Sequence, residues 1–560
     1  MKRFLRYPII LFAAIGMFYY GCSSGLRQAD ERMTGADSTW IEPASVNNLF
    51  LDSTAVAAFL QEHPEFKQQE NQVWKFYSTR KYQFAWFNND GMVEQASHLI
   101  NTLSHLENEA IVDTSVYGSR LMQLYDSIAT GNYTVQGVDA VTRETELLLS
   151  ATFFRYAEKI WGGIGEKDLQ EADWFIKKKR LPYVAILDSM LSNPTYFAKQ
   201  QPVYRQYDLL KTQLKQYYEL EKKGNWTIIE ADKKSYKPGD SSTSIQEIRK
   251  RLYLLGDLTT PDTASMIYDQ TMEAAVKNFQ NRHGLAIDGA IGPSMLTELN
   301  TPVSSRIQQI MINMERSRWV PVQLKGDYLA VNIPAYKLYV YEDDSLEWEC
   351  NVVVGSINNK SVIFNGNMKY IVFSPYWNIP ASIVAKETLP AIKRNRGYLA
   401  SHNMEVVGGS GVVNPASVNW EKYSGYNFPY TIRQKPGPNN SLGRVKFLFP
   451  NEYSIYLHDT PAKSLFEEPS RAFSHGCIRV SEPKKLAAHL LRHDTTWTAA
   501  KIDAAMNRNK ENTVTLETPV PVFIAYFTAW VDRSGRLNFR RDVYGHDERL
   551  AKKMFSSTDL

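Results

Sequence analysis

Cysteine is scarce in this sequence: three residues, Cys22, Cys350 and Cys477, occur in a chain of 560. A disulfide-stapled scaffold is therefore excluded, because a chain of this length with at most one bridge must be stabilised by its hydrophobic cores. The three cysteines lie in different sequence contexts, so each needs an interpretation of its own.

Long hydrophobic segments and a strong charge of either sign are also missing. The mean hydropathy of −0.37 excludes a polytopic membrane protein. The net charge of +4 is too small to require a nucleic acid, and we expect none among the partners. With 43% hydrophobic and 22% charged residues, the composition is that of a globular protein and excludes a disordered or collagen-like chain. The length allows about three to four domains of ordinary size.

The start of the chain carries an apolar run, Pro8–Tyr20, behind a positively charged N-terminus. The run is too short to span a bilayer comfortably and suits the apolar part of a signal peptide. Because it leads to Cys22, residues 1–22 resemble a bacterial lipoprotein signal. The resemblance implies that the mature chain begins at a lipidated Cys22, is exported to the periplasm and is anchored to a membrane of the cell envelope. Plain signal cleavage or a short anchor is the alternative, and residues 23–48 are expected to be a polar linker.

Two helical units are expected next. Apolar residues recur at steps of three and four in residues 49–232, for example over 96–103 and 145–160, which predicts a helical scaffold. Residues 241–302 predict two amphipathic helices and a third that Pro293 opens, because proline suits the first turn of a helix. This unit resembles the small three-helix peptidoglycan-binding domain in three residue pairs: Phe279-Gln280, Gly284-Leu285 and Asp288-Gly289.

A change of period marks the third part of the chain. In residues 326–497, short runs rich in tyrosine and valine predict a mostly β domain. Residues 380–443 interrupt it with an irregular stretch that is too long for an ordinary loop, so we expect an inserted capping subdomain there. Residues 498–560 are expected to form a C-terminal extension with a β-hairpin that turns at 532–535. The predicted fold class is therefore multidomain α+β.

Cys350 lies in a predicted strand, where Trp348, Val352 and Val354 share its side and polar residues occupy the other. A cysteine on the apolar face of a strand is usually a buried and inert thiol. That is the role we predict for Cys350.

Cys477 stands in a different setting, the run Ser474-His475-Gly476-Cys477, with His458 upstream at the end of a predicted strand. A nucleophilic cysteine reacts as the thiolate, which a nearby imidazole supplies by taking the proton. Gly476 allows a tight turn, so that backbone amides around Cys477 can stabilise the oxyanion of a tetrahedral intermediate. Arg479 adds a positive charge that could help the thiolate or bind a substrate carboxylate.

This arrangement of His458, Ser474–Cys477 and Arg479 resembles the signature of the YkuD-type L,D-transpeptidases. Arg80–Phe87, Tyr376-Trp377 and Phe527–Trp530 extend the resemblance to the large YcbB-like class of that family, over most of the chain.

The resemblance implies a role for each residue of the motif. Cys477 is the implied nucleophile and His458 the implied general base. The oxyanion neighbourhood and supporting positions are the remaining members: His475, Gly476, Tyr456, Arg479 and Ser474. Whether the side chain or the backbone carbonyl of Asp459 orients His458 is left open.

The family's chemistry defines what the protein is expected to do. The cysteine attacks the carbonyl before the terminal D-Ala of a peptidoglycan tetrapeptide stem, D-Ala leaves, and an amine of a second stem resolves the thioester. The resemblance thus implies 3→3 cross-links between stems of the meso-diaminopimelate type, cell wall biogenesis, and carbapenems as inhibitors. Lipoprotein amines, D-amino acids and water stay open as acyl acceptors, and no cofactor is implied.

Two other interpretations remain. A wall-binding lipoprotein with an inactive catalytic fold is the non-enzymatic one. A zinc site is the enzymatic one, but no glutamate accompanies the histidine pair as in His-Glu-x-x-His, so we expect no metal. The zinc-binding residue types are His458, His475 and Cys477, and the pair His489 and His493.

Overall fold

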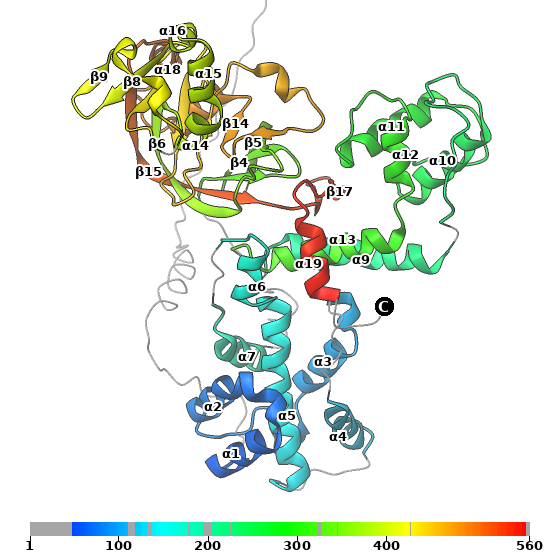
Figure 1. The fold of residues 1–560 in the computed structure, drawn as a ribbon. Coiled ribbons are helices and arrows are strands. Elements are labelled where there is room, and N and C mark those ends of the chain that lie inside the picture. Colours follow the sequence, from blue (N-terminus) through cyan, green and yellow to red (C-terminus); the bar gives the residue numbers. More distant parts are fainter. Residues whose placement is uncertain are drawn as a thin grey trace, which may run out of the picture.

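The computed structural model describes residues 48–109, 118–131, 137–176, 180–193, 203–224, 226–321, 326–343, 345–425 and 427–555. Cys22, the signal-like segment and most of the expected linker lie outside the described residues. Among those described, no helix is both long and apolar enough to span a membrane. Figure 1 shows a helical scaffold, a smaller helical unit and a β-rich body, with helices α9 (Gln206–Lys222) and α13 (Val303–Ser317) running side by side between them.

The scaffold is built around α5 (Ala140–Ala157), which is buried along nearly its whole length and continues as a π-helical turn, η4 (Glu158–Gly162). The helices predicted over 96–103 and 145–160 are confirmed by α3 and α5. Apolar side chains of α9, α13 and the surrounding elements, most of them buried, form one core around α5. Those elements are α1 (Ser53–Glu62), η1 (Pro64–Gln69), α2 (Glu70–Thr79), β1 (Phe87–Asn88), β2 (Gly91–Met92), α3 (Glu94–Leu103), η2 (Leu106–Glu109), α4 (Ser119–Ala129) and α7 (Tyr183–Ser192).

The smaller unit has the three predicted helices, α10 (Thr243–Leu254), α11 (Gln270–Arg282) and α12 (Pro293–Leu299). Pro293 occupies the first turn of α12, where its missing N–H leaves no hydrogen bond unmade. The helices enclose a small apolar core of their own, which includes Phe279 at 0% exposure.

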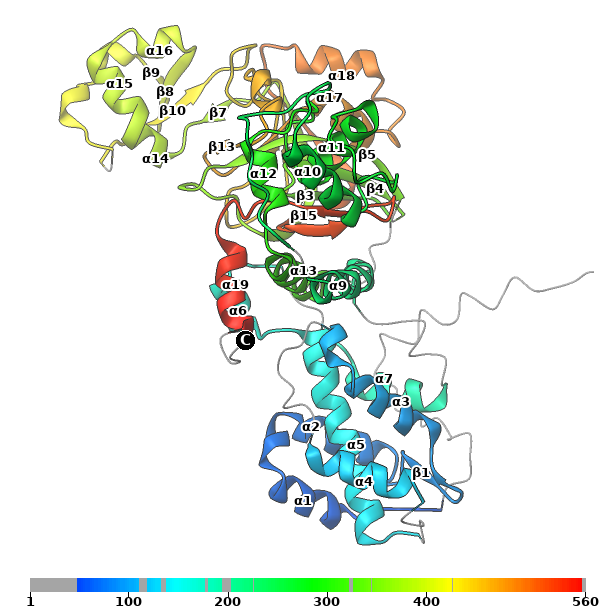
Figure 2. The ribbon, with the colours of Figure 1, turned by 90° about the vertical axis from the view of Figure 1, so that its right-hand side faces the viewer.

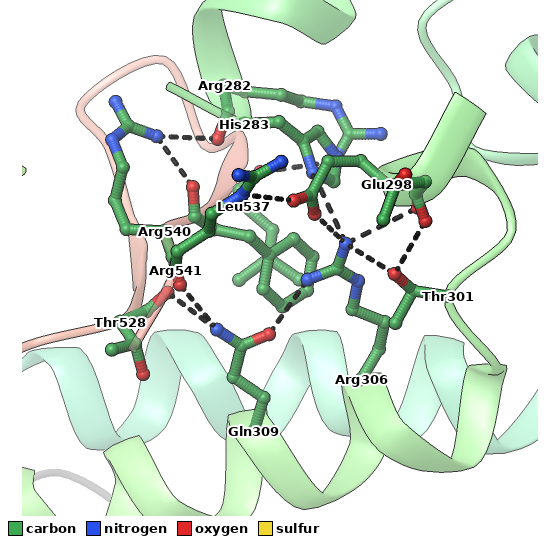
Figure 3. Close-up of polar contacts among 12 residues, drawn as sticks. Arg282, His283, Glu298, Thr301, Arg306, Gln309, Thr528, Leu537, Arg540 and Arg541 are labelled. Atoms are coloured by element: carbon green, nitrogen blue, oxygen red, sulfur yellow. Dashed lines mark hydrogen bonds and ion pairs between the residues drawn. The ribbon is translucent and has the colours of Figure 1, made fainter. Parts of the chain in front are cut away.

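Figure 3 shows how this unit is fixed to the rest of the molecule. The carboxylate of Glu298, in α12, contacts Arg306 of α13 and Arg541 of the C-terminal segment, with N–O distances of 2.6 and 3.2 Å. Gln309 of α13 donates a hydrogen bond of 2.9 Å to the carbonyl oxygen of Arg540. Polar side chains thus join three segments that are far apart in the sequence.

The β-rich body is a nine-stranded sheet in the order β13-β5-β14-β12-β11-β6-β15-β3-β4. Because β4 also pairs with β5, the sheet closes on itself around an apolar core. The helices α17 (Pro483–Leu490) and α18 (Ala499–Met506) follow β14. The strands are β3 (Tyr328–Asn332), β4 (Lys337–Glu342), β5 (Ser345–Gly355), β6 (Phe364–Phe373), β11 (Val445–Leu448), β12 (Leu457–His458), β13 (Ala472–Ser474), β14 (Ile478–Val480) and β15 (Asn512–Ala525).

Two segments join this body from outside residues 326–497. Strand β15 pairs with β6 and β3, so the sheet continues past residue 497, where the sequence suggested its end. Trp174, of the segment after α6 (Glu166–Glu171), forms a parallel bridge with Ile363 and packs in the same core. Beyond β15 the chain forms the expected hairpin, β16 (Ala529–Val531) and β17 (Leu537–Phe539), and then α19 (His546–Phe555).

Between β6 and β11 the chain leaves the barrel and forms a separate four-stranded sheet in the order β7-β10-β8-β9, with its own apolar core. We call this inserted subdomain, residues 377–434, the cap; Figure 2 shows it projecting to one side of the barrel. Its strands are β7 (Trp377–Asn378), β8 (Met404–Gly408), β9 (Gly411–Val413) and β10 (Thr431–Gln434). Its helical elements are α14 (Ala381–Ile383), the π-helical turn η5 (Val384–Thr388), α15 (Leu389–Arg394), α16 (Tyr398–Ser401), η6 (Pro415–Ser417) and η7 (Trp420–Lys422).

Candidate active site

His458 and Cys477 lie on neighbouring parallel strands. His458 ends β12, Cys477 directly precedes β14, and the register places His458 opposite Arg479. The amide of Ile478 donates a hydrogen bond of 3.1 Å to the carbonyl oxygen of Tyr456. The sheet thus holds the two candidate catalytic residues on adjacent strands inside the sheet, with Ile478, the residue after Cys477, opposite Leu457, the residue before His458.

The imidazole of His458 is buried and oriented by the backbone. Its Nδ1 lies 2.6 Å from the carbonyl oxygen of Asp459. Since a carbonyl oxygen only accepts, Nδ1 carries the proton and Nε2 keeps a free lone pair. Burial and the charge of Arg479 lower the pKa of His458 to about 4, so the ring is neutral at physiological pH. This settles the open question in favour of the Asp459 backbone.

The Asp459 side chain has a different task. Its Oδ2 accepts a hydrogen bond of 2.8 Å from the amide of Arg444, and its Oδ1 accepts one of 2.7 Å from the amide of Thr460. Lys463 Nζ lies 2.6 Å from the same Oδ1. The carboxylate therefore fixes the loop after β12 and keeps the Asp459 carbonyl in place for His458.

The thiol of Cys477 is partly buried and points to the carbonyl oxygen of Ser454, at 3.6 Å. Ser454 has a positive φ of 55°, which is uncommon for a residue other than glycine and clusters at functional sites. Burial raises the pKa of the Cys477 thiol, against opposing effects of Tyr456 and Arg479. Thiol and imidazole are therefore both neutral at rest, and the thiolate forms only when a base takes the proton.

The turn before Cys477 is held by its own hydrogen bonds. Gly476 has a φ of +116°, a conformation that strains any residue with a Cβ. Ser474 Oγ accepts from the amide of Gly476 at 3.1 Å and donates to the carbonyl oxygen of Cys477 at 2.6 Å. Ser474 therefore shapes the turn, and the Gly476 amide is engaged within it.

Tyr456 and Arg479 flank the pair. The rings of Tyr456 and His458 meet edge to face with centroids 5.6 Å apart. Burial raises the pKa of the Tyr456 hydroxyl, and proximity to Cys477 adds to the effect. Arg479 Nε is buried without a hydrogen-bond partner in the described part of the chain, and its charge lowers the pKa of both His458 and Cys477.

The side chain of His475 does not join this group. Its Nε2 lies 3.0 Å from Oε1 of Glu387 in the cap. Both side chains are about half exposed, at 50% and 55%. The imidazole of His475 thus connects the cap to residues 474–477, which we call the catalytic turn. Only the backbone of His475 can take part in the oxyanion site.

Cys350 and His489 lie in packed surroundings. Cys350 is 5% exposed in the barrel core and, like Cys477, is a free thiol; burial raises its pKa to about 11, as expected for an inert residue. His489 packs edge to face against Trp348. No group of three or more His, Cys, Asp or Glu side chains suited to a metal occurs within the described ranges.

Comparison with known protein families agrees with this geometry. Residues 326–522 match the sequence family of the L,D-transpeptidase catalytic domain, named YkuD. Residues 71–214 match the scaffold domain family, and residues 241–299 match the peptidoglycan-binding domain family. The predicted family and fold class are both confirmed.

The individual relatives match only part of this chain. A Haemophilus influenzae protein whose name assigns it to the L,D-transpeptidases is 35% identical over 248 residues, 44% of this chain and 50% of the relative. This chain therefore spans about half the length of that curated relative. Solved L,D-transpeptidase structures from Xylanimonas cellulosilytica and Stackebrandtia nassauensis are 13% and 15% identical, with TM-scores of 0.17 and 0.22. Each covers 53% of this chain, and 100% and 97% of its own chain.

Three residues of the candidate site were not part of the sequence motif. Ser361 Oγ donates a hydrogen bond of 2.7 Å to the carbonyl oxygen of Gly476. Tyr544 Oη, from the C-terminal extension, donates one of 2.6 Å to the carbonyl oxygen of Gly355, beside Ser361. Glu387 reaches the turn from the cap. Each contact joins segments that are far apart in the chain, and no spacing rule in the sequence could reveal them.

Proposed function

We propose that this protein is an L,D-transpeptidase that forms 3→3 cross-links in peptidoglycan through a thioester on Cys477. The observation that carries the proposal is the neutral imidazole of His458, whose proton sits on Nδ1 and whose Nε2 is left to act as base. A neutral cysteine needs such a base to become a nucleophile.

In the first half-reaction, Sγ of Cys477 attacks the carbonyl before the terminal D-Ala of a tetrapeptide stem. The thiol proton passes to His458 Nε2 while the C–S bond forms. The peptide bond to D-Ala then breaks, and the leaving nitrogen takes the proton from His458. Because the Gly476 amide is engaged by Ser474, the amide of Cys477 is the donor that this turn offers to the oxyanion.

In the second half-reaction, the amine of a second stem attacks the thioester carbonyl. His458 Nε2 takes a proton from the attacking nitrogen and returns it to Sγ as the C–S bond breaks. Stems of the meso-diaminopimelate type are the proposed donor and acceptor; lipoprotein amines, D-amino acids and water are alternative acceptors. The peptidoglycan-binding unit supports peptidoglycan as the substrate.

The proposed place of action is the cell envelope, facing the periplasm. This rests on the signal-like residues 1–22 and on Cys22 as a lipidated residue that anchors the chain to a membrane. Metabolic labelling with a fatty acid analogue tests it: wild-type protein should carry the label, and Cys22→Ala should lose it.

The activity is tested by incubating the full chain with purified tetrapeptide stems and analysing the products by mass spectrometry. Wild-type protein should yield cross-linked dimers and free D-Ala, and a carbapenem should add its mass to the protein. Cys477→Ala should abolish both, whereas Cys350→Ala should retain both. An adduct that persists on Cys477→Ala would contradict the assignment of the nucleophile.

A further inference from the structure

The cap reaches the catalytic turn through Glu387, whose Oε1 lies 3.0 Å from Nε2 of His475, two positions before Cys477. The two side chains are 55% and 50% exposed. An ion pair with this exposure contributes little to stability. The position of this carboxylate therefore needs a reason other than holding the cap in place.

The local fold holds Glu387 at this point. It lies in the π-helical turn η5, where Val384 and Thr388 are buried at 5% and 2% and anchor both ends. The chain at Gly425 packs so closely on this turn that an added Cβ would come within 2.0 Å of the Cβ of Ala385. π-helical turns occur frequently at functional sites. Glu387 thus projects from a constrained segment.

Glu387 also has capacity to bind a cation. In the described chain its Oε2 has no hydrogen-bond partner, and an ionised carboxylate accepts at both oxygens. The carboxylate of Asp459, which is nearer to His458 in the sequence, is already engaged by Arg444, Thr460 and Lys463. Glu387 is therefore the better placed acceptor for a positively charged group that approaches the turn.

We propose that Glu387 binds the side-chain ammonium of the diamino acid in the acceptor stem and so delivers the attacking amine to the thioester. The inference rests on the proposed function. A side-chain amine is an ammonium at neutral pH, and it must lose one proton to solvent before its nitrogen attacks. The nitrogen then bonds to the thioester carbonyl, a second proton passes through His458 to Sγ, and the C–S bond breaks.

The test is how the acyl-enzyme partitions between water and the amine acceptor. The full chain is incubated with tetrapeptide stems, and cross-linked and hydrolysed products are quantified in the same sample. Glu387→Gln should lower the ratio of transfer to hydrolysis by about tenfold, the loss typical for one hydrogen bond to a charged group. This ratio does not depend on how fast the acyl-enzyme forms, so it reports on the acceptor alone.

Two controls separate charge recognition from damage to the cap. Glu421→Gln removes another cap carboxylate, which pairs with Arg396 at 2.6 Å and is 65% exposed, and it should leave the ratio unchanged. Hydroxylamine, a neutral amine at neutral pH, should accept the acyl group equally well from wild-type protein and from Glu387→Gln. Near-UV circular dichroism checks that both variants are folded.

The same ammonium also occurs in the donor stem, so the KM of the donor for D-Ala release is measured as well. A higher KM for Glu387→Gln with an unchanged partition ratio would show that Glu387 binds the donor stem, and would overturn the acceptor proposal. An unchanged KM and an unchanged ratio would overturn any role in binding the ammonium. If wild-type protein itself forms no acyl-enzyme, the proposed function fails, which is a distinct outcome.

Discussion

Ser361 Oγ donates a hydrogen bond of 2.7 Å to the carbonyl oxygen of Gly476, 115 residues further along the chain. That carbonyl and the amide of Cys477 belong to one peptide unit, which is planar and trans, so the two groups point in opposite directions. The hydrogen bond from Ser361 therefore fixes the direction in which the Cys477 N–H points. Ser361 is itself fixed, because its Oγ accepts from the amide of Gly355 at 2.9 Å and its amide donates to Tyr544 Oη at 3.3 Å.

Ser361→Ala should slow acylation of Cys477. Without the hydroxyl, the Gly476 carbonyl loses its buried donor and the peptide unit is free to rotate. We expect the rate of carbapenem acylation to fall by about tenfold, less than the ~100-fold that loss of an oxyanion donor itself costs. Stopped-flow acylation kinetics measure it, with the effect in the rate constant rather than in binding.

Alkylation by iodoacetamide is the matched readout for this variant, because it proceeds without an oxyanion. Its rate should be the same in wild-type protein and in Ser361→Ala. Ser356→Ala, in the same loop, removes a hydroxyl whose side-chain contact is with Asn359 at 3.3 Å and should leave acylation unchanged. If alkylation slows as much as acylation, Ser361 acts on the thiol and the oxyanion explanation is wrong.

The sequence could reveal the parts of this site that are local. Ser474–Cys477 and Arg479 are almost contiguous, and His458 precedes them at the spacing of the family motif. Cys350 was predicted as a buried thiol because apolar and polar residues alternate around it, and the structure confirms its burial.

The sequence could not reveal the strand pairings that close the barrel or the contacts that end on backbone groups. Strand β15 enters the sheet between β6 and β3, a pairing that no local pattern encodes. The contact of Ser361 with Gly476 ends on a carbonyl oxygen, a group that every residue carries. Whether the side chain or the carbonyl of Asp459 orients His458 likewise depends on the path of the loop, which the sequence does not show.

The acid limb of the pH profile should report the low pKa of His458. Burial and Arg479 lower that pKa to about 4, and the base acts only when it is neutral. The acylation rate should therefore stay level as the pH falls through ~6.5, the ordinary value for histidine, and should halve near pH 4. Carbapenem acylation followed by mass spectrometry across this range measures it; a midpoint near the ordinary value would contradict the assignment.

Arg479→Gln should shift the acid limb of the pH profile to higher pH. A nearby positive charge disfavours the imidazolium, so removing it raises the pKa of His458. The same change should raise the pKa of the Cys477 thiol further, because Arg479 favours the thiolate. Alkylation rates against pH should show the second shift. Arg479→Lys keeps the charge and should stay close to wild type in both profiles, which separates charge from shape.

Glu298→Gln should loosen the smaller helical unit from the β-rich body. Glu298 contacts Arg306 at 2.6 Å and His283 at 3.7 Å, all at 10% exposure or less, as Figure 3 shows. Burial alone raises the pKa of Glu298, but its contacts with His283 and Arg306 hold it well below its ordinary value. The carboxylate is thus ionised at neutral pH, and its neutralisation leaves buried Arg306 without a counter-charge, at a cost of about 3 kcal/mol.

Urea unfolding of the full chain at neutral pH measures this loss. Because the pKa of Glu298 is lower when folded than when unfolded, its contribution is present at neutral pH and is lost as the pH falls below ~4.3. The difference between wild-type protein and Glu298→Gln should therefore shrink on acidification. Glu273→Gln removes the 29% exposed partner of Lys277 in the same unit and should cost less than about 1 kcal/mol. Equal losses for the two variants would show that the contacts of Glu298 do not hold the unit in place.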